Sequence, residues 1–373
     1  MEFHFFDTLT CRNQTCSVQE VMRMSIEHSF FSRFAMALGV MHFLAACAGS
    51  GLQAVSSVAL SPSPLPLSGS IVLKPPVLSF NDTGLSVSDG VTRNGLWEVE
   101  SADMGWEFSL DRGISWTRGT GSFFEVKDDG AKVIWVRARD DAGNTSEIVR
   151  VNCVLDTIAP AAFLISHQRN GMTNILNFSG IEPEAHWEYA LDPQGTWMPG
   201  KGTGLAIFGN GFNRVWLRQV DLAGNTSAPQ AFDLKHPSMA FLKASNNPLQ
   251  PSDLAQGQQT LLIHGVVAHG DADFVRWDIA KDQRLLSVKW VHHDAKTATA
   301  FYALQPSGVF DAGSDVSRML VHGRAGASNL GRNLLANLPK SKLGEGPMTL
   351  MLEQSAKEPT SYMIEVILTS ADD

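Results

Sequence analysis

Hydrophobic and polar residues alternate with a period of two along much of the chain after residue 75. Trp106, Phe108 and Leu110 alternate with Glu107 and Ser109, which is typical of a half-buried β-strand. Turn residues separate such runs, and the segment lacks the apolar spacing of helices. The pattern predicts an all-β protein. We expect further strands where the alternation recurs, at residues 133–137, 275–279, 286–290 and 362–368.

The most apolar stretch of the chain, residues 30–46, ends in Leu-Ala-Ala and is followed directly by Cys47. Arg33 interrupts this stretch, and the apolar part after it is about a dozen residues, whereas a bilayer core of ~30 Å requires roughly 20. The length favours a signal-peptide core. The ending resembles the lipobox of bacterial lipoproteins, which implies cleavage after Ala46 and a diacylglycerol on the thiol of Cys47. Residues 1–46 are therefore predicted to be a signal peptide.

The residues around this signal refine the prediction. Met22 or Met24 is a candidate true start, because a signal peptide does not need the residues before them. Ala48 stands where lipoproteins retained at the inner membrane carry Asp, so the resemblance implies the outer membrane. Residues 47–75 are rich in Ser and Pro, a composition that cannot bury a core and that favours a semi-extended tether.

An internal repeat determines the predicted domain organisation. Matched residues lie 81 positions apart, as Trp106 and Trp187 do, and the Asp-Ala-Gly-Asn-type turns 140–146 and 221–227 keep the same offset. These units resemble the bacterial immunoglobulin-like repeats of surface adhesins. The resemblance implies two tandem immunoglobulin-like β-sandwiches, at residues 76–157 and 158–237.

Acidic residues at such repeat junctions imply, by the same resemblance, a calcium site. The candidate ligands in the first repeat are Asp82, Asp89, Asp140 and Asp156, since oxygen ligands suit this cation. A second interpretation stays open, in which Asp-x-Ala-Gly-Asn is an ordinary tight turn with Gly143 at positive φ. No cofactor is otherwise expected, and the second repeat has lost most of these acidic positions.

From residue 238 to 373 the repeat ends and different strands follow. Residues 270–278 resemble the start of bacterial pre-peptidase C-terminal domains, which implies a jelly-roll-like β-sandwich. We expect one short helix within 328–338. Five histidines (His264, His269, His292, His293 and His322), with Asp271 and Asp273, are either metal ligands or surface and turn residues.

Composition narrows the function. The net charge of −9 and the lack of a basic run argue against nucleic acid as a partner. No catalytic motif is recognisable, so we predict no enzyme. The repeated tryptophans are interpreted as core residues, with sugar stacking as the other interpretation. We expect an exported, lipid-anchored binding, adhesion or spacer protein with an envelope protein or a glycan as partner. The alternatives are a carbohydrate-binding accessory lipoprotein, or an enzyme with a site in residues 238–373.

Overall fold

The computed structural model describes residues 72–100, 105–209, 213–234, 243–255, 257–294, 299–354, 357 and 359–372. The predicted signal peptide, Cys47 and nearly all of the tether lie outside these residues. The all-β prediction is confirmed, because the regular structure described consists of strands and three short 3₁₀ turns. Among the described residues, no helix has the length and apolar character to cross a bilayer. The 3₁₀ turns are η1 (Val316–Arg318), η2 (Ala327–Asn329) and η3 (Lys340–Lys342).

The first repeat is a sandwich of two sheets. Its core joins Trp97 of one sheet to Trp106, Ile134 and Val136 of the other, and each of these side chains is buried. The buried thiol of Cys153 belongs to the same core and forms no disulfide. The sheet orders are β1 (Val77–Phe80), β3 (Leu96–Glu100), β6 (Phe123–Glu125), and β2 (Val91–Thr92), β8 (Val149–Leu155), β7 (Gly130–Ala138), β4 (Trp106–Ser109), β5 (Thr117–Arg118).

The face of β7 that points into the core is the opposite of the predicted one, which included Trp135. Ile134 and Val136 are fully buried, whereas Trp135 is only half-buried on the opposite face. A shift of one residue exchanges the two faces of a strand, because successive side chains point to opposite sides. The second repeat shows the same parity, with Val215 and Leu217 buried and Trp216 half-buried.

The second repeat also has two layers. A four-stranded sheet packs through Trp187 and Tyr189 against strands that carry Leu176 and Leu205. The four-stranded sheet is β12 (Met198–Pro199), β11 (His186–Ala190), β14 (Arg214–Val220), β15 (Gln230–Asp233), and the facing strands are β9 (Leu164–Asn170), β10 (Thr173–Ser179), β13 (Gly204–Phe208).

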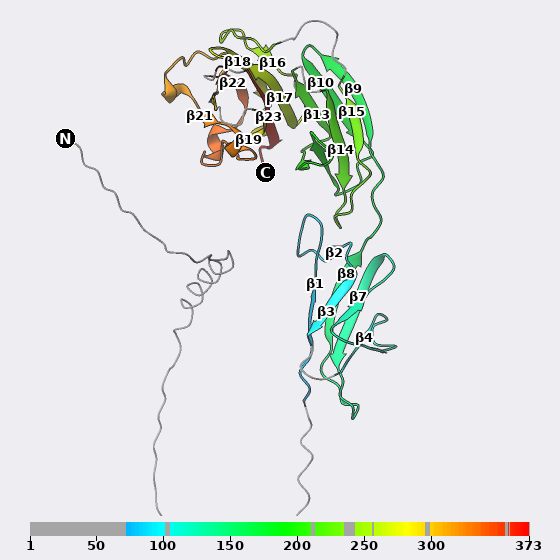
Figure 1. The fold of residues 1–373 in the computed structure, drawn as a ribbon. Helices are drawn as coiled ribbons and strands as arrows, with labels where there is room; N and C mark the ends of the chain where they lie inside the picture. The colour runs from blue at the N-terminus through cyan, green and yellow to red at the C-terminus, as the bar shows by residue number, and fades with distance from the viewer. Residues whose placement is uncertain are drawn as a thin grey trace, which may run out of the picture. The chain divides into compact units, whose positions relative to one another are not determined.

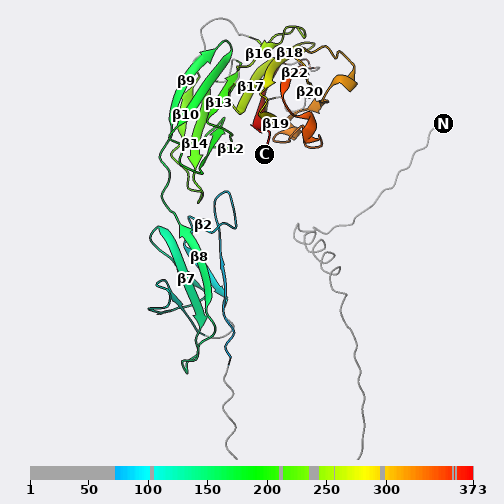
Figure 2. The ribbon, with the colours of Figure 1, turned by 180° about the vertical axis from the view of Figure 1, so that it is seen from behind.

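One six-stranded sheet continues from the second repeat into the C-terminal region, and β13 and β17 lie side by side in Figures 1 and 2. The parallel pairing of β13 with β17 aligns Leu205 with Thr260 and Phe208 with Ile263. The predicted boundary at residue 237 falls in the segment 235–242, outside the described residues. The sheet order is β19 (Gln283–His293), β23 (Thr360–Ser370), β17 (Thr260–Val267), β13, β10, β9.

A five-stranded sheet covers the other face of this shared sheet. Strand β23 is consequently buried on both faces: Tyr362 and Ile364 point into the C-terminal core, while Met363 packs in the core of the second repeat. The sequence pattern predicted only the first of these faces. The five-stranded order is β16 (Ser252–Asp253), β18 (Ala272–Ile279), β22 (Gly346–Gln354), β20 (Ala300–Gln305), β21 (Val321–Ala325).

Two local expectations in this region need correction. Leu286 is 37% exposed, because a β-bulge between Leu285 and Ser287 shifts the alternation and buries Leu285 in its place. The helix expected within 328–338 is absent from these described residues, where η2 is followed by turns. Asn333 gives the reason, since its side chain accepts backbone N–H groups of Val288 (3.2 Å) and Leu335 (3.1 Å).

The two repeats contact each other through the Asp-x-Ala-Gly-Asn turn of the second one. The hydroxyl of Thr83 donates to the carbonyl of Ala223 (2.6 Å), and the guanidinium of Arg93 donates to the carbonyl of Gly224 (2.5 Å). The side-chain amide of Asn225 donates in return to the carbonyl of Asp156 (2.8 Å). The junction is therefore a hydrogen-bonded interface rather than a bare linker.

Candidate functional site

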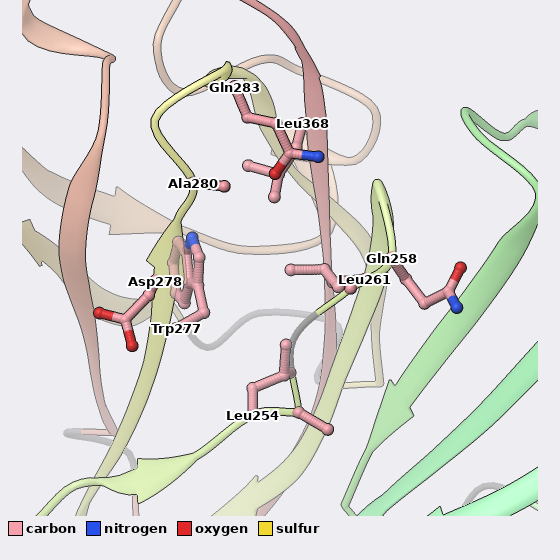
Figure 3. A pocket seen from close by; sticks show the side chains of 10 residues that line it. Leu254, Gln258, Leu261, Trp277, Asp278, Ala280, Gln283 and Leu368 are labelled. Carbon is pink, nitrogen blue, oxygen red and sulfur yellow. The ribbon is translucent and has the colours of Figure 1, made fainter.

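A hollow of about 310 Å³ lies at one end of the C-terminal sandwich, where the end of β18 faces the segment that leads into β17 (Figure 3). Its volume is in the range of ligand pockets, which start at roughly 300 Å³. Three of its ten lining residues are leucines. The lining residues are Leu254, Ala255, Gly257, Gln258, Leu261, Trp277, Asp278, Ala280, Gln283 and Leu368.

Trp277 is the central polar feature of the hollow. It belongs to the inward-facing set of β18 and is 2% exposed, as the alternation predicts. Its indole nitrogen is buried without a hydrogen-bond partner. Figure 3 shows that nitrogen on the ring edge directed toward Ala280 at the border of the hollow. A buried donor without a partner costs about 1–3 kcal/mol.

The remaining polar side chains differ in where they point. Gln283 extends its amide beside Leu368 (Figure 3). Gln258 points toward the neighbouring strand and donates its amide to Asn177 (2.8 Å). Asp278 turns away from Leu261 and accepts from Arg276 (3.2 Å). The groups that line the hollow are thus apolar side chains, the ring of Trp277 and one neutral amide, which suits an uncharged ligand.

The structure brings three of the four predicted calcium ligands to one end of the first repeat. Asp82 accepts the backbone N–H of Gly90 (2.8 Å), and its other carboxylate oxygen is buried without a hydrogen bond. Asp89 accepts from Val91 (2.9 Å). Asp156 follows β8, which pairs with β2 beside them.

Asp140 does not join this group. It follows the opposite end of β7, whose register pairs Gly130 with Leu155, so it lies a full nine-residue strand away, about 27 Å. Its carboxylate accepts both the backbone N–H (2.8 Å) and the side-chain amide (2.7 Å) of Asn144, and these bonds lower its pKa. Within the described ranges, no three His, Cys, Asp or Glu residues gather as a metal site. Calcium binding stays a prediction, and Cys47 lies outside the described residues.

The repeated tryptophans fall into two classes. Trp106 and Trp187 are core residues, as predicted. Trp116 and Trp197 are half-buried and each lies under an arginine, at 3.9 Å from Arg137 and 4.2 Å from Arg218.

In both repeats the arginine that stacks on the half-buried tryptophan also contacts a carboxylate. Arg137 forms an ion pair with Glu107 (2.6 Å), and Arg218 forms one with Glu188 (2.6 Å). Burial has the largest single effect on the pKa of Glu107 and raises it, but hydrogen bonds and charges of Arg137 and Arg139 together lower it. The pKa of Glu188 is lowered mainly by the hydrogen bond from His186, against burial and with a further contribution from Arg218. Because arginine already covers these outer indole rings, their faces are not bare stacking platforms for sugars.

The polar residues of the C-terminal core are more buried than expected. His264 and His293 are 6% and 7% exposed, which contradicts the interpretation of all five histidines as surface or turn residues. Asp273 is 1% exposed, and one of its oxygens accepts the hydroxyl of Tyr362 (2.9 Å). Burial raises the pKa of Asp273 to about 6, although the hydrogen bond from Tyr362 and the charge of Lys243 oppose the rise.

Comparisons with known proteins find folds but no family. No family model matches the chain, and no curated protein matches it. A solved carbohydrate-binding module of the β-sandwich superfamily is 8% identical, covers 78% of this chain and 94% of its own, and has a TM-score of 0.23. A complex with a xylogluco-oligosaccharide is 10% identical, covers 80% of each chain, and scores 0.21. The FN1–FN3 domains of chicken CNTN1 are 8% identical, cover 79% and 93%, and score 0.17.

These superpositions are too loose for a ligand or an activity to be inferred from them. The resemblances to adhesin repeats and pre-peptidase domains therefore stay predictions. The sequence placed Trp277 correctly on a buried face, but nothing in its pattern indicated the hollow. The hollow arises from the approach of Leu254, Gln258, Gln283 and Leu368, which come from three distant parts of the chain.

Proposed function

We propose that this chain is a non-catalytic, lipid-anchored binding protein of the bacterial cell envelope, and that its C-terminal sandwich binds a short neutral saccharide. The observation that carries the proposal is the hollow at Trp277, with its leucine side chains and the amide of Gln283. A sugar ring has apolar C–H faces and hydroxyl oxygens. Leu254 and Leu261 would meet the former, while Gln283 would hydrogen-bond the latter.

The rest of the chain has a part in this proposal. Cys47 would carry the lipid at the outer membrane, and residues 47–75 would act as the tether. The two repeats would act as a spacer that displays the C-terminal sandwich. Their hydrogen-bonded junction supports this role, because the bonds from Thr83 and Arg93 to the second repeat restrict the angle between them.

Titration of the purified protein with mono- to tetrasaccharides of glucose, N-acetylglucosamine and xylose, followed by calorimetry, tests the site. Gln283→Ala should weaken binding about threefold to tenfold, because a neutral hydrogen bond contributes about 0.5–1.5 kcal/mol. Gln168→Ala is the matched control, since Gln168 is an exposed glutamine on β9 away from the hollow. Binding that is equal in both variants would place the sugar elsewhere, and the absence of binding by every saccharide would contradict the proposal.

A further inference from the structure

Strand β21 ends the five-stranded sheet of the C-terminal sandwich and lies at its margin in Figure 1. In the described part of the chain, β20 is the one strand that pairs with it, over the register from Ala300–Ala325 to Leu304–Val321. An edge strand directs part of its N–H and C=O groups away from the sheet. The exposure of His322 and Arg324 on this strand is consistent with an open edge.

A first hollow, of about 390 Å³, lies on the outer face of the sheet beside this edge. The register places Phe301 opposite both Arg324 and Glu353, so the three form one row across three strands. Met351 extends the apolar floor, and the segment 313–319 forms a wall in which Val316 is 51% exposed. This hollow offers an apolar surface with charges at its rim.

A second hollow, of about 130 Å³, lies by the opposite face of the same strand. Tyr302 pairs with Gly323, one position along from the pair of Phe301 and Arg324. The side chain of Tyr302 therefore points to the opposite face of the sheet from those of Phe301 and Arg324. Arg332 lies close enough to Tyr302 for its charge to act on that hydroxyl. No carboxylate is among the lining residues, which are Tyr302, Arg324, Ala325, Asn329, Arg332, Asn333, Leu334, Ala336 and Asn337.

The two hollows flank a single edge strand, and we propose that β21 is a docking site for an extended peptide of another protein. The peptide adds to the sheet as a sixth strand, with main-chain hydrogen bonds to β21. Since successive side chains of a strand point to opposite faces, neighbouring residues of the peptide enter different hollows. An apolar side chain fits the hollow floored by Phe301 and Met351.

The neighbouring side chain of the peptide is acidic. It enters the second hollow, where Arg332 supplies positive charge and the asparagines supply amide donors. The five residues of β21 match a peptide strand of about five residues, or about 17 Å. This partner differs in chemistry and in place from the saccharide assigned to the hollow at Trp277.

Fluorescence anisotropy with the full chain and a capped, labelled heptapeptide of alternating valine and glutamate tests the inference. The peptide should bind, and a peptide with lysine in place of glutamate should bind at least about tenfold more weakly, because like charges meet in the second hollow. Two further versions carry N-methyl groups on alternate residues, one at every valine and the other at every glutamate. One of the two should lose binding, because only alternate residues of an added antiparallel strand direct their N–H groups to β21. Binding of both methylated versions as tight as that of the parent would overturn strand addition, as would failure of the parent peptide to bind.

Two variants locate the site. Val316→Asp should weaken binding about tenfold or more by placing a carboxylate in the apolar hollow, whereas Leu249→Asp should leave it unchanged. Leu249 is a matched control because it is 62% exposed and lines neither hollow. Arg332→Gln should reduce the preference for glutamate over lysine. Equal losses in the Val316 and Leu249 variants, or an unchanged preference in the Arg332 variant, would contradict the assignment.

Discussion

The hydrogen bond between Tyr189 and Glu365 predicts that the second repeat and the C-terminal sandwich unfold together. The Tyr189 hydroxyl donates to the Glu365 carboxylate at 2.7 Å, and both side chains are at most 1% exposed. Lys289 lies 3.2 Å from the other carboxylate oxygen. Burial raises the pKa of Tyr189 well above its usual range, and the negative charge of Glu365 and the hydrogen bond to it raise this pKa further. The hydroxyl therefore remains a donor at neutral pH.

Tyr189→Phe removes this donor and keeps the ring. A hydrogen bond to a charged group contributes about 1.5–3 kcal/mol, and because Lys289 still faces the carboxylate we expect a loss of about 2 kcal/mol in the free energy of unfolding. Since one sheet joins the two regions, the loss should appear in both. Urea denaturation gives the magnitude, and hydrogen exchange of β11 and β17 shows whether both lose protection equally.

Tyr302→Phe is the control, because Tyr302 is half-buried and belongs to β20, away from the shared sheet. We expect it to change the free energy of unfolding by less than about 0.5 kcal/mol. A loss confined to β11, or a Tyr189→Phe effect as small as that of the control, would refute the reasoning.

Three further predictions concern protonation, calcium and the lipid. The pKa of Asp273 is about 6 in the folded protein and about 3.8 when unfolded, so the folded state binds the extra proton and stability falls as pH rises from about 4 to 6. Asp273→Asn should abolish this slope and raise the free energy of unfolding at pH 7 by about 1–3 kcal/mol in urea titrations; an unchanged slope would contradict the assignment. Millimolar calcium should raise the melting temperature of the first repeat in the full chain, because a free ion concentration of a hundred times the dissociation constant stabilises the folded state by about 2.7 kcal/mol. Asp82→Asn should reduce this shift, and a melting temperature that does not respond to calcium would mean that these segments are turns. Cys47→Ala should abolish labelling by a palmitate analogue and release the protein from membranes, and labelling that persists would contradict the lipid anchor.

The sequence predicted the strands better than it predicted which of their faces is buried. The constant offset of 81 residues located equivalent strands in both repeats, and the alternation of Val275, Trp277 and Ile279 gave the buried face of β18 correctly. On β7 the large ring of Trp135 suggested the wrong face. An arginine stacked on an outer tryptophan conceals part of its apolar surface, so hydrophobicity alone does not identify the core side.

The shared sheet could not be inferred from any local pattern. The alternation at 362–368 predicts one buried face, yet Met363 and Ile367 are buried on the other. Glu365 lies between them at 1% exposure, and a glutamate at that position reads as solvent-facing in the sequence. Its partners, Tyr189 and Lys289, are 176 and 76 residues away, so only the tertiary fold satisfies the charge. A buried carboxylate with such distant partners is costly to leave unpaired, which makes correct docking of the second repeat onto β23 a condition for stability of both regions.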